Sequence, residues 1–341
     1  MARAYLDDDF LLFSETARKL FHDTAKNLPI IDYHTHLPPD EVATNQRWEN
    51  ITDLWLGHDH YKWRAMRASG IPESHITGSA PPKEKFRAWA ETIPNTLRNP
   101  LYDWTHLELR RCFGINTLLS PKTADKIWEA CNERLADEEF SAQGLLRKFR
   151  VDAIGTTDDP TDNLSHHEIA NASDCPTKIY PTFRPDKAFF VDRPSLLNPW
   201  LNDLGEDIVT FTDFLTALKS RHNYFHDKGC RLTDHGMCYA LSNPCNESKA
   251  DQILDKVRKG EAANPEETDS FGALIMYHVG QWVSEKDWTM QLHLGPKRNP
   301  NTRLFDKLGP DSGFDTIGDW PQGEALLSFL DSLCKLNKLP K

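Results

Sequence analysis

Five short segments with the composition of β-strands alternate along this chain with segments of helical periodicity. The strand candidates cover residues 29–34, 151–156, 177–183, 230–232 and 288–292. The clearest amphipathic helical segments between and around them are residues 10–27, 141–150, 162–171, 212–228, 265–286 and 318–333. This alternation predicts βαβ units and a parallel sheet, because parallel neighbours need a crossover connection and a helix usually supplies it.

Each strand candidate ends in polar residues capable of chemistry. They are His34 and His36, Asp158 and Asp159, Arg184, Asp234 and His235, and His293. In a (β/α)₈ barrel all carboxyl ends of the strands open onto the face that holds the active site. A doubly wound sheet is the alternative, but polar ends on successive strands favour an α/β fold of the (β/α)₈ TIM-barrel type.

The segment from residue 38 to residue 136 contains no convincing strand and several helical patterns. At about 100 residues it is much longer than an ordinary connection. We therefore expect a helical insertion, residues 38–136, directly after the first strand of a single barrel domain that covers residues 1–341. Such an insertion is expected to pack over the strand ends and to form part of a pocket wall.

The sequence His34-Thr35-His36 follows the apolar run of the first strand, and Pro38 stops that strand. Side chains two residues apart on a strand point to the same face, so both imidazoles can aim at one point. That arrangement suits a metal ion. Two solvated histidines in a turn are the alternative.

His293, after the last strand candidate, is a possible third nitrogen ligand or a histidine that only packs and hydrogen-bonds to the backbone. His60 and Tyr61 lie side by side in the insertion, among aromatic and basic residues, and are candidates for general acid–base work. On the residues alone, a surface helix anchored by Trp63 is the simpler interpretation of that pair.

Arg184 and Arg298 are candidates for binding an anionic substrate, because a guanidinium group grips a carboxylate with two hydrogen bonds. Structural ion pairs are the alternative for both arginines. Asp234 is a candidate for orienting a base or binding a substrate hydroxyl, and a capping or loop-stabilising role is its alternative.

The formal net charge of −11 argues against general nucleic-acid binding by phosphate neutralisation. No apolar run reaches the length of a membrane span, and the acidic first residues do not resemble a signal peptide. The 7 cysteines are scattered without a Cys-X-X-Cys pair, which fits free thiols in a reducing cytoplasm. We therefore expect a cytoplasmic protein with a small-molecule partner and without nucleic-acid or membrane partners, and the sequence leaves a homo-oligomer open.

Several longer motifs in this chain resemble the uronate isomerases of the amidohydrolase-like superfamily. They are spread over the chain: IDYHTH at 31–36, LWLGHDHYKWRAMR at 54–67, WTHLEL at 104–109, TTDDP at 156–160, PTFRPDKA at 181–188, DHG at 234–236, MQLHLG at 290–295, NTR at 301–303 and LGPDSGFD at 308–315. The resemblance implies a barrel of the metal-dependent hydrolase type. It also implies an aldose–ketose isomerase that converts D-glucuronate to D-fructuronate and D-galacturonate to D-tagaturonate through an enediolate, in hexuronate catabolism.

Carried over by position, the resemblance makes His34 and His36 ligands of a divalent metal, for which we expect zinc. It implies catalytic roles for His60, Tyr61 and His293. It implies that Arg184, Asp234 and Arg298 contact the hexuronate substrate.

Members of that family continue beyond the position of Lys341, through strands six to eight, and strand eight supplies a metal-binding aspartate. We therefore expect about five barrel strands here and a chain that is incomplete at its C-terminus, with negligible isomerase activity by itself. The alternatives are a metal-dependent hydrolase of the same superfamily and an inactive fragment.

Overall fold

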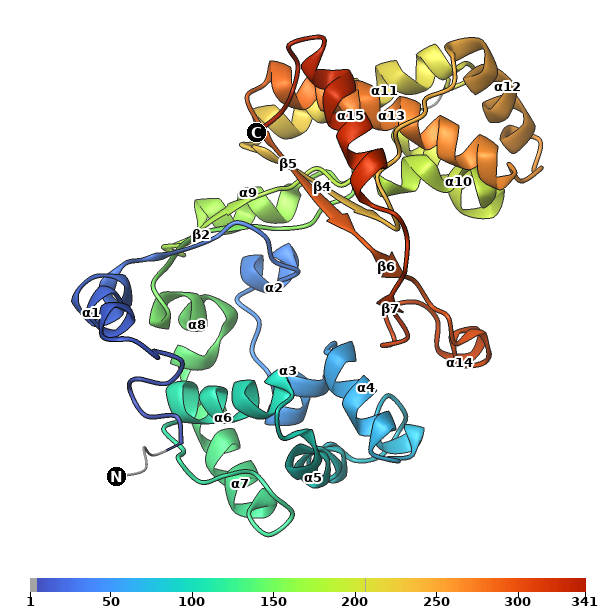
Figure 1. The fold of residues 1–341 in the computed structure, drawn as a ribbon. Coiled ribbons are helices and arrows are strands. Elements are labelled where there is room, and N and C mark those ends of the chain that lie inside the picture. Colours follow the sequence, from blue (N-terminus) through green and yellow to red (C-terminus); the bar gives the residue numbers. More distant parts are fainter. Residues whose placement is uncertain (1–4, 206) are drawn as a thin grey trace. The chain divides into compact units, whose positions relative to one another are not determined.

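The computed structural model describes residues 5–205 and 207–341, and the chain divides into two compact units (Figure 1). Unit 1 comprises residues 1–30, 44–152 and 299–315. Unit 2 comprises residues 31–43, 153–298 and 316–341. Each unit buries its own cluster of apolar side chains. Within the described ranges, no helix is both long enough and apolar enough to cross a membrane.

Unit 1 is helical. Its α-helices are α1 (Glu15–Asp23), α3 (Ile51–Leu56), α4 (His60–Ala68), α5 (Pro82–Thr92), α6 (Pro100–Phe113), α7 (Ala124–Leu135), α8 (Ala142–Lys148) and α14 (Thr302–Leu308). Its short 3₁₀ helices are η1 (Ala25–Asn27), η2 (Glu73–His75), η3 (Ile93–Thr96) and η4 (Glu138–Phe140). The expected helical insertion, residues 38–136, falls on α2 (Pro39–Ala43) of unit 2 and on α3 to α7.

Several of these helices start where a side chain accepts the otherwise unpaired N–H groups of the first turn. Ser14 accepts from Ala17 N and begins α1, which is therefore shorter than the predicted 10–27. Asn50 caps α3 and Asp59 caps α4 in the same way. At the other end, Gly114 adopts the left-handed conformation that commonly closes a helix and ends α6.

The longer strands follow one another in chain order. They are β1 (Ile30–Asp32), β2 (Val151–Gly155), β3 (Lys178–Tyr180), β4 (Leu232–Met237) and β5 (Thr289–Leu294). One sheet has the order β1-β2-β3 and another pairs β4 with β5, and the pairs β2–β3 and β4–β5 are parallel. Isolated parallel bridges from Phe183 to Asp158 and to Thr233 connect these two sheets. Neighbours in space are thus neighbours in sequence, unlike the reversing strand order of a doubly wound sheet.

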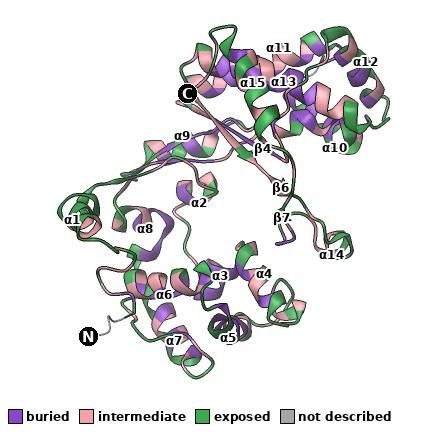
Figure 2. Cartoon of the chain, viewed as in Figure 1, coloured by how far each residue is buried: buried purple, intermediate pink, exposed green. Residues whose placement is uncertain are grey.

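The helices of unit 2 are α2, α9 (Ser165–Ala172), η5 (Asp186–Asp192), α10 (Pro194–Leu204), α11 (Phe211–Asp227), α12 (Glu247–Arg258), α13 (Pro265–Glu285) and α15 (Gly323–Cys334). Capping boxes begin α11 at Thr210 and α13 at Asn264. Buried residues of α10 to α13 and α15 form the apolar core of unit 2, and Figure 2 shows them in purple along the inner faces of these helices. The core fixes the helices around the strands that carry the candidate site.

The predicted mixed α/β architecture is confirmed, and no closed barrel is formed by the described residues. The predicted fourth strand is wrong in its bounds: β4 continues to Met237 instead of ending at Leu232, so Asp234 and His235 lie inside the strand. From the sequence, these polar residues were expected to form a loop. In the structure, β4 pairs with β5 at six positions, and this pairing keeps them in a strand. The first strand ends at Asp32, before His34, and the third ends before Pro181, which cannot donate to a ladder.

Several elements have no counterpart among the predicted ones, including α14, η5 and the three that follow. Helix α10 contains Pro199, and α12 is rich in charge, with its apolar residues confined to one face. The third is an antiparallel hairpin of β6 (Pro296–Lys297) with β7 (Thr316–Ile317). On the free side of β5, the N–H of Met290 donates to the carbonyl of Lys341 at 3.0 Å.

Candidate metal and substrate site

Asp234 and His293 lie on adjacent parallel strands of unit 2 and on the same face. Asp234 of β4 is paired with Gln291 of β5, and His293 stands two residues further along β5. Residues two apart on a strand share a face, so His293 reaches diagonally towards Asp234. Its Nδ1 lies 2.9 Å from Asp234 Oδ1.

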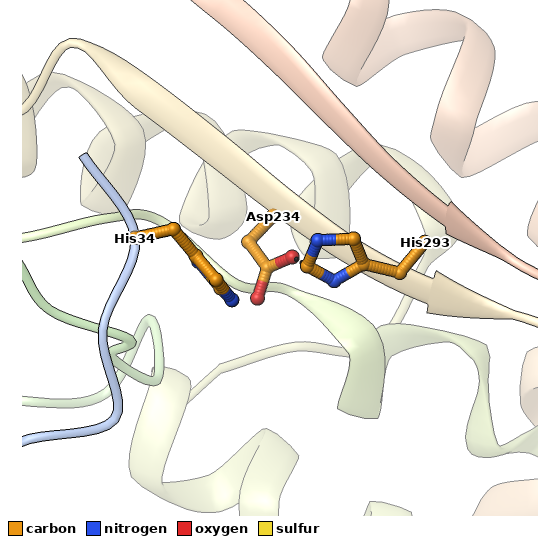
Figure 3. Close-up of side chains that lie close together, drawn as sticks. All are labelled: His34, Asp234 and His293. Atoms are coloured by element: carbon orange, nitrogen blue, oxygen red, sulfur yellow. Dashed lines mark ion pairs between the residues drawn. The ribbon is translucent and has the colours of Figure 1, made fainter. Parts of the chain in front are cut away.

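His34 completes a cluster of three possible metal ligands with this pair (Figure 3). One ligand atom from each of His34, Asp234 and His293 lies within 4.8 Å of the other two. The rings of His34 and His293 are 4.8 Å apart between centroids, at an angle of 69°. Three such donors with an open side are typical of catalytic metal centres.

The chemistry of these donors fits a divalent cation. The side chain of Asp234 is completely buried, and its two oxygens accept no hydrogen bond of acceptable geometry from the described residues. The Nδ1 atom of His34 is also buried without a hydrogen-bond partner there. Burial lowers the pKa of His34 below the ordinary histidine value, which favours the neutral imidazole that a metal requires.

Arg184 links this cluster to a second acidic residue. Its Nη1 lies 3.1 Å from Asp234 Oδ2, and its Nε donates to Asp186 Oδ2 at 3.0 Å. Asp186 also accepts from the backbone N–H of Gly236 at 3.0 Å. Burial raises the pKa of Asp186, although Arg184 and the Gly236 N–H act in the opposite direction. Arg184 is therefore held on two sides, with its guanidinium group beside the metal-ligand cluster.

Arg184 and Arg298 approach each other over Gly236. A Cβ atom placed on Gly236 would lie 2.9 Å from Arg184 Nη2 and 3.4 Å from Arg298 Nη2. Two guanidinium groups facing one small space form a natural receptor for a carboxylate. The missing side chain of Gly236 keeps that space open.

His36 is exposed and lies outside the three-residue cluster, although its ring is 5.2 Å from that of His34 between centroids. His60 and Tyr61 belong to unit 1, where they begin α4. Their ring centroids are 4.4 Å apart, and Tyr61 is 59% exposed. The proposed acid–base roles of these two residues stay predictions.

The structure adds Asp186 to the residues around the site and brings His235, expected only as a polar residue at a strand end, close to it. Asp186 was visible in the sequence only as a turn residue after the third strand. His235 is fully buried on β4, and burial lowers its pKa to about 3, so its ring is neutral at physiological pH. Its Nδ1 lies 3.9 Å from Asp186 Oδ1.

Comparison with known proteins identifies the group to which this chain is related. The sequence model of the family described as Glucuronate isomerase matches residues 2–341. The chain belongs to the glucuronate isomerase family. A uronate isomerase of Solibacter usitatus is 52% identical over 342 residues, which span 99% of this chain and 73% of that protein. One of Opitutus terrae is 49% identical over 343 residues, which span 99% of this chain and 72% of that protein.

The fold of the chain is also that of the family. The crystal structure of a uronate isomerase from Thermotoga maritima superimposes with a TM-score of 0.93 at 36% identity, covering 99% of this chain and 74% of that one. The family resemblance drawn from the sequence motifs is thus confirmed. The roles of the individual site residues do not follow from these comparisons and are argued below.

Proposed function

We propose that this protein is a uronate isomerase that interconverts D-glucuronate with D-fructuronate and D-galacturonate with D-tagaturonate through an enediolate. The observation that carries the proposal is the position of His34, Asp234 and His293 directly beside Arg184, with Arg298 close to Arg184. A hexuronate offers a carboxylate for guanidinium groups and neighbouring oxygens for a metal. Family membership supports the same reaction.

His34, Asp234 and His293 are the residues that would hold a divalent metal, and we assign His36, whose ring centroid is 5.2 Å from that of His34, as a further ligand. Zinc suits histidine nitrogen and carboxylate oxygen donors. A bound metal would supply Lewis-acid polarisation of the substrate oxygens, which stabilises the negative charge of an enediolate. This assignment moves Asp234 and His293 from the substrate and catalytic roles expected from the sequence to the metal.

The remaining residues of the chain bind substrate and transfer the proton. Arg184 and Arg298 bind the carboxylate and so orient the sugar chain relative to the cluster. Proton movement between C2 and C1 needs a positioned acid–base group. We assign this role to Tyr61 with His60, whose adjacent rings begin α4.

The strands β1 to β5, adjacent in chain order and linked by parallel bridges at Phe183, support the first five strands of a (β/α)₈ barrel. The 7 cysteines are free thiols in the structure, which supports a cytoplasmic location. Both assignments are parts of the same proposal.

The test is an assay of the purified product of the complete gene, loaded with zinc, with D-glucuronate and D-galacturonate as substrates. We expect the ketouronate products in the NMR spectrum and loss of activity after chelation, restored by zinc. Sugar lactones and esters serve as the comparison substrates. Lactone or ester hydrolysis without uronate turnover would overturn the proposal in favour of a metal-dependent hydrolase, and no turnover of either class would overturn both.

A further inference from the structure

The residue between His34 and His36 is attached to the end of β2 by both of its backbone polar groups. The N–H of Thr35 donates to the carbonyl of Gly155 at 2.8 Å. The carbonyl of Thr35 accepts from the hydroxyl of Thr157 at 3.1 Å. One residue is thus held at two points by a strand end that lies about 120 residues further along the chain.

The two segments approach so closely that a side chain at residue 155 has no room. A Cβ atom on Gly155 would lie 2.6 Å from the carbonyl oxygen of Tyr33 and 3.4 Å from the Thr182 hydroxyl. Real Cβ atoms do not approach backbone oxygens to that distance. Glycine at this position allows the close backbone approach that the two hydrogen bonds need.

The end of β2 is itself fixed by buried polar contacts. The hydroxyl of Thr156 donates to Asp158 Oδ2 at 2.6 Å and lies 2.7 Å from His167 Nε2. Asp158 Oδ2 also accepts from the N–H of Thr182 at 3.0 Å. The side chains of Thr156, Asp158 and His167 are all buried. Thr157 therefore projects its hydroxyl from a rigid support.

We propose that Thr157 is a positioning residue for the candidate metal centre. Its hydrogen bond fixes the peptide group that joins Thr35 to His36, and together with Gly155 it sets the directions in which His34 and His36 leave the backbone. Thr157 is not one of the three clustered ligand residues, so we assign its effect to the backbone that carries the histidines. The inference rests on the proposed function, because it presumes that these histidines bind a metal.

The test compares Thr157→Val, which keeps the shape and removes the donor, with Thr157→Ser, which keeps the donor. Thr157→Ala is a second variant without the hydroxyl, in case Val disturbs packing. Thr216→Val is the matched control, because the Thr216 hydroxyl donates to Thr212 within the exposed face of α11. The readouts are Co²⁺ affinity and the visible spectrum of bound Co²⁺. Hydrogen exchange of residues 33–37 is measured without metal.

We expect Thr157→Val and Thr157→Ala to weaken Co²⁺ binding by about tenfold or more, as loss of a residue that orients a ligand does. The Co²⁺ spectrum is expected to change, exchange of residues 33–37 to accelerate, and Thr157→Ser to restore most of the affinity. Affinity and exchange equal to those of Thr216→Val would overturn the positioning role. If the unsubstituted protein binds no Co²⁺, the metal assignment fails, and the exchange data then decide alone whether Thr157 holds the segment.

Discussion

The Nδ1 atom of His293 lies 2.9 Å from Oδ1 of Asp234, so an exposed imidazole covers a completely buried carboxylate. Arg184 lies at the other oxygen, at 3.1 Å. A buried carboxylate needs a cationic neighbour such as Arg184, hydrogen bonds or a metal ion to offset the loss of its hydration. Asp234 is therefore the residue on which the electrostatics of the site depend most.

Asp234→Asn is expected to remove tight metal binding, because the neutral amide cannot replace an anionic ligand. We expect affinity for Zn²⁺ or Co²⁺ to fall by on the order of 100-fold or more, beyond the loss typical of residues that only orient a ligand. Isothermal titration calorimetry measures it. Asp255→Asn is the control, because Asp255 forms an exposed ion pair with Lys259 on α12. An unchanged metal stoichiometry in Asp234→Asn would contradict the ligand assignment.

His34→Ala and His36→Ala are expected to differ. His34 is part of the three-residue cluster and His36 lies beside it, so His34→Ala should weaken Co²⁺ binding more than His36→Ala. The double substitution is expected to abolish binding. Competition with a chelating dye gives all three affinities, and equal losses for the two single variants would argue that both histidines are ligands of equal weight.

Arg298→Ala and Arg184→Ala are expected to separate substrate binding from metal binding. Arg298→Ala should reduce kcat/KM for uronates by roughly 10- to 100-fold, the effect of losing a hydrogen bond to a charged group, while metal affinity stays unchanged. Arg184→Ala should reduce kcat/KM and also change metal affinity, because Arg184 contacts Asp234. Steady-state kinetics and metal titration on both proteins measure these effects. A change of metal affinity in Arg298→Ala alone would reverse the assignment.

Gly313→Ala is expected to disturb the start of α4, where His60 and Tyr61 lie. Residue 313 has a φ of +88°, and a Cβ there would lie 2.5 Å from the carbonyl oxygen of His60. Gly70→Ala is the matched control, because its φ is +80° and no atom lies within 4 Å of the added carbon. Both variants carry the backbone cost of about 1 kcal/mol, and only Gly313→Ala adds a collision. The free energy of unfolding in urea and kcat are both expected to fall more in Gly313→Ala than in Gly70→Ala. Equal losses in the two variants would refute the expected collision with His60.

His222 is expected to make unit 2 sensitive to acid. It is fully buried beside Trp288, with ring centroids 4.2 Å apart, and neither ring nitrogen has a hydrogen-bond partner among the described residues. Burial lowers its pKa from 6.5 to about 3, and Lys286, His226 and Lys219 act in the same direction. The unfolded chain takes up a proton below pH 6.5 that the folded state resists, so the free energy of unfolding falls as the pH falls from 6.5 towards 3.

Between pH 7 and pH 5 this loss is about 2 kcal/mol. Urea titrations followed by tryptophan fluorescence at the two pH values measure it, since Trp282 and Trp288 flank His222. His222→Leu is expected to lose less stability on acidification than the unsubstituted protein. His166→Leu, at an exposed position of α9, is expected to keep the original pH dependence. If the free energy of unfolding fell equally with pH in all three proteins, a group other than His222 would be responsible for the acid sensitivity.

The alternation of strands with helices along the chain was predictable, because period-two and helical patterns reflect burial within each segment. The C-terminal end of β4 could not be predicted from these patterns. Thr233, Asp234 and His235 have the polarity of a loop, and only pairing with β5 and complete burial keep them in a strand.

Asp186 and Thr157 show a second limit of sequence reasoning. Asp186 looked like an ordinary turn residue, and its contact with Gly236 N joins segments 50 residues apart. The Thr157 hydroxyl donates to the backbone carbonyl of Thr35. Every residue has such a carbonyl, so a single sequence does not show which one is used. Such contacts depend on how distant strand ends meet, which local patterns do not specify.

Gly236 has a consequence for the redesign of substrate range. The space between Arg184 and Arg298 is bounded on one side by a hydrogen atom instead of a side chain. A Cβ atom at residue 236 would lie only 2.9 Å from Arg184 Nη2, so alanine or serine there would displace the guanidinium group and change the space left for an anionic group. The geometry of the two arginines therefore depends on a position that carries no functional group of its own.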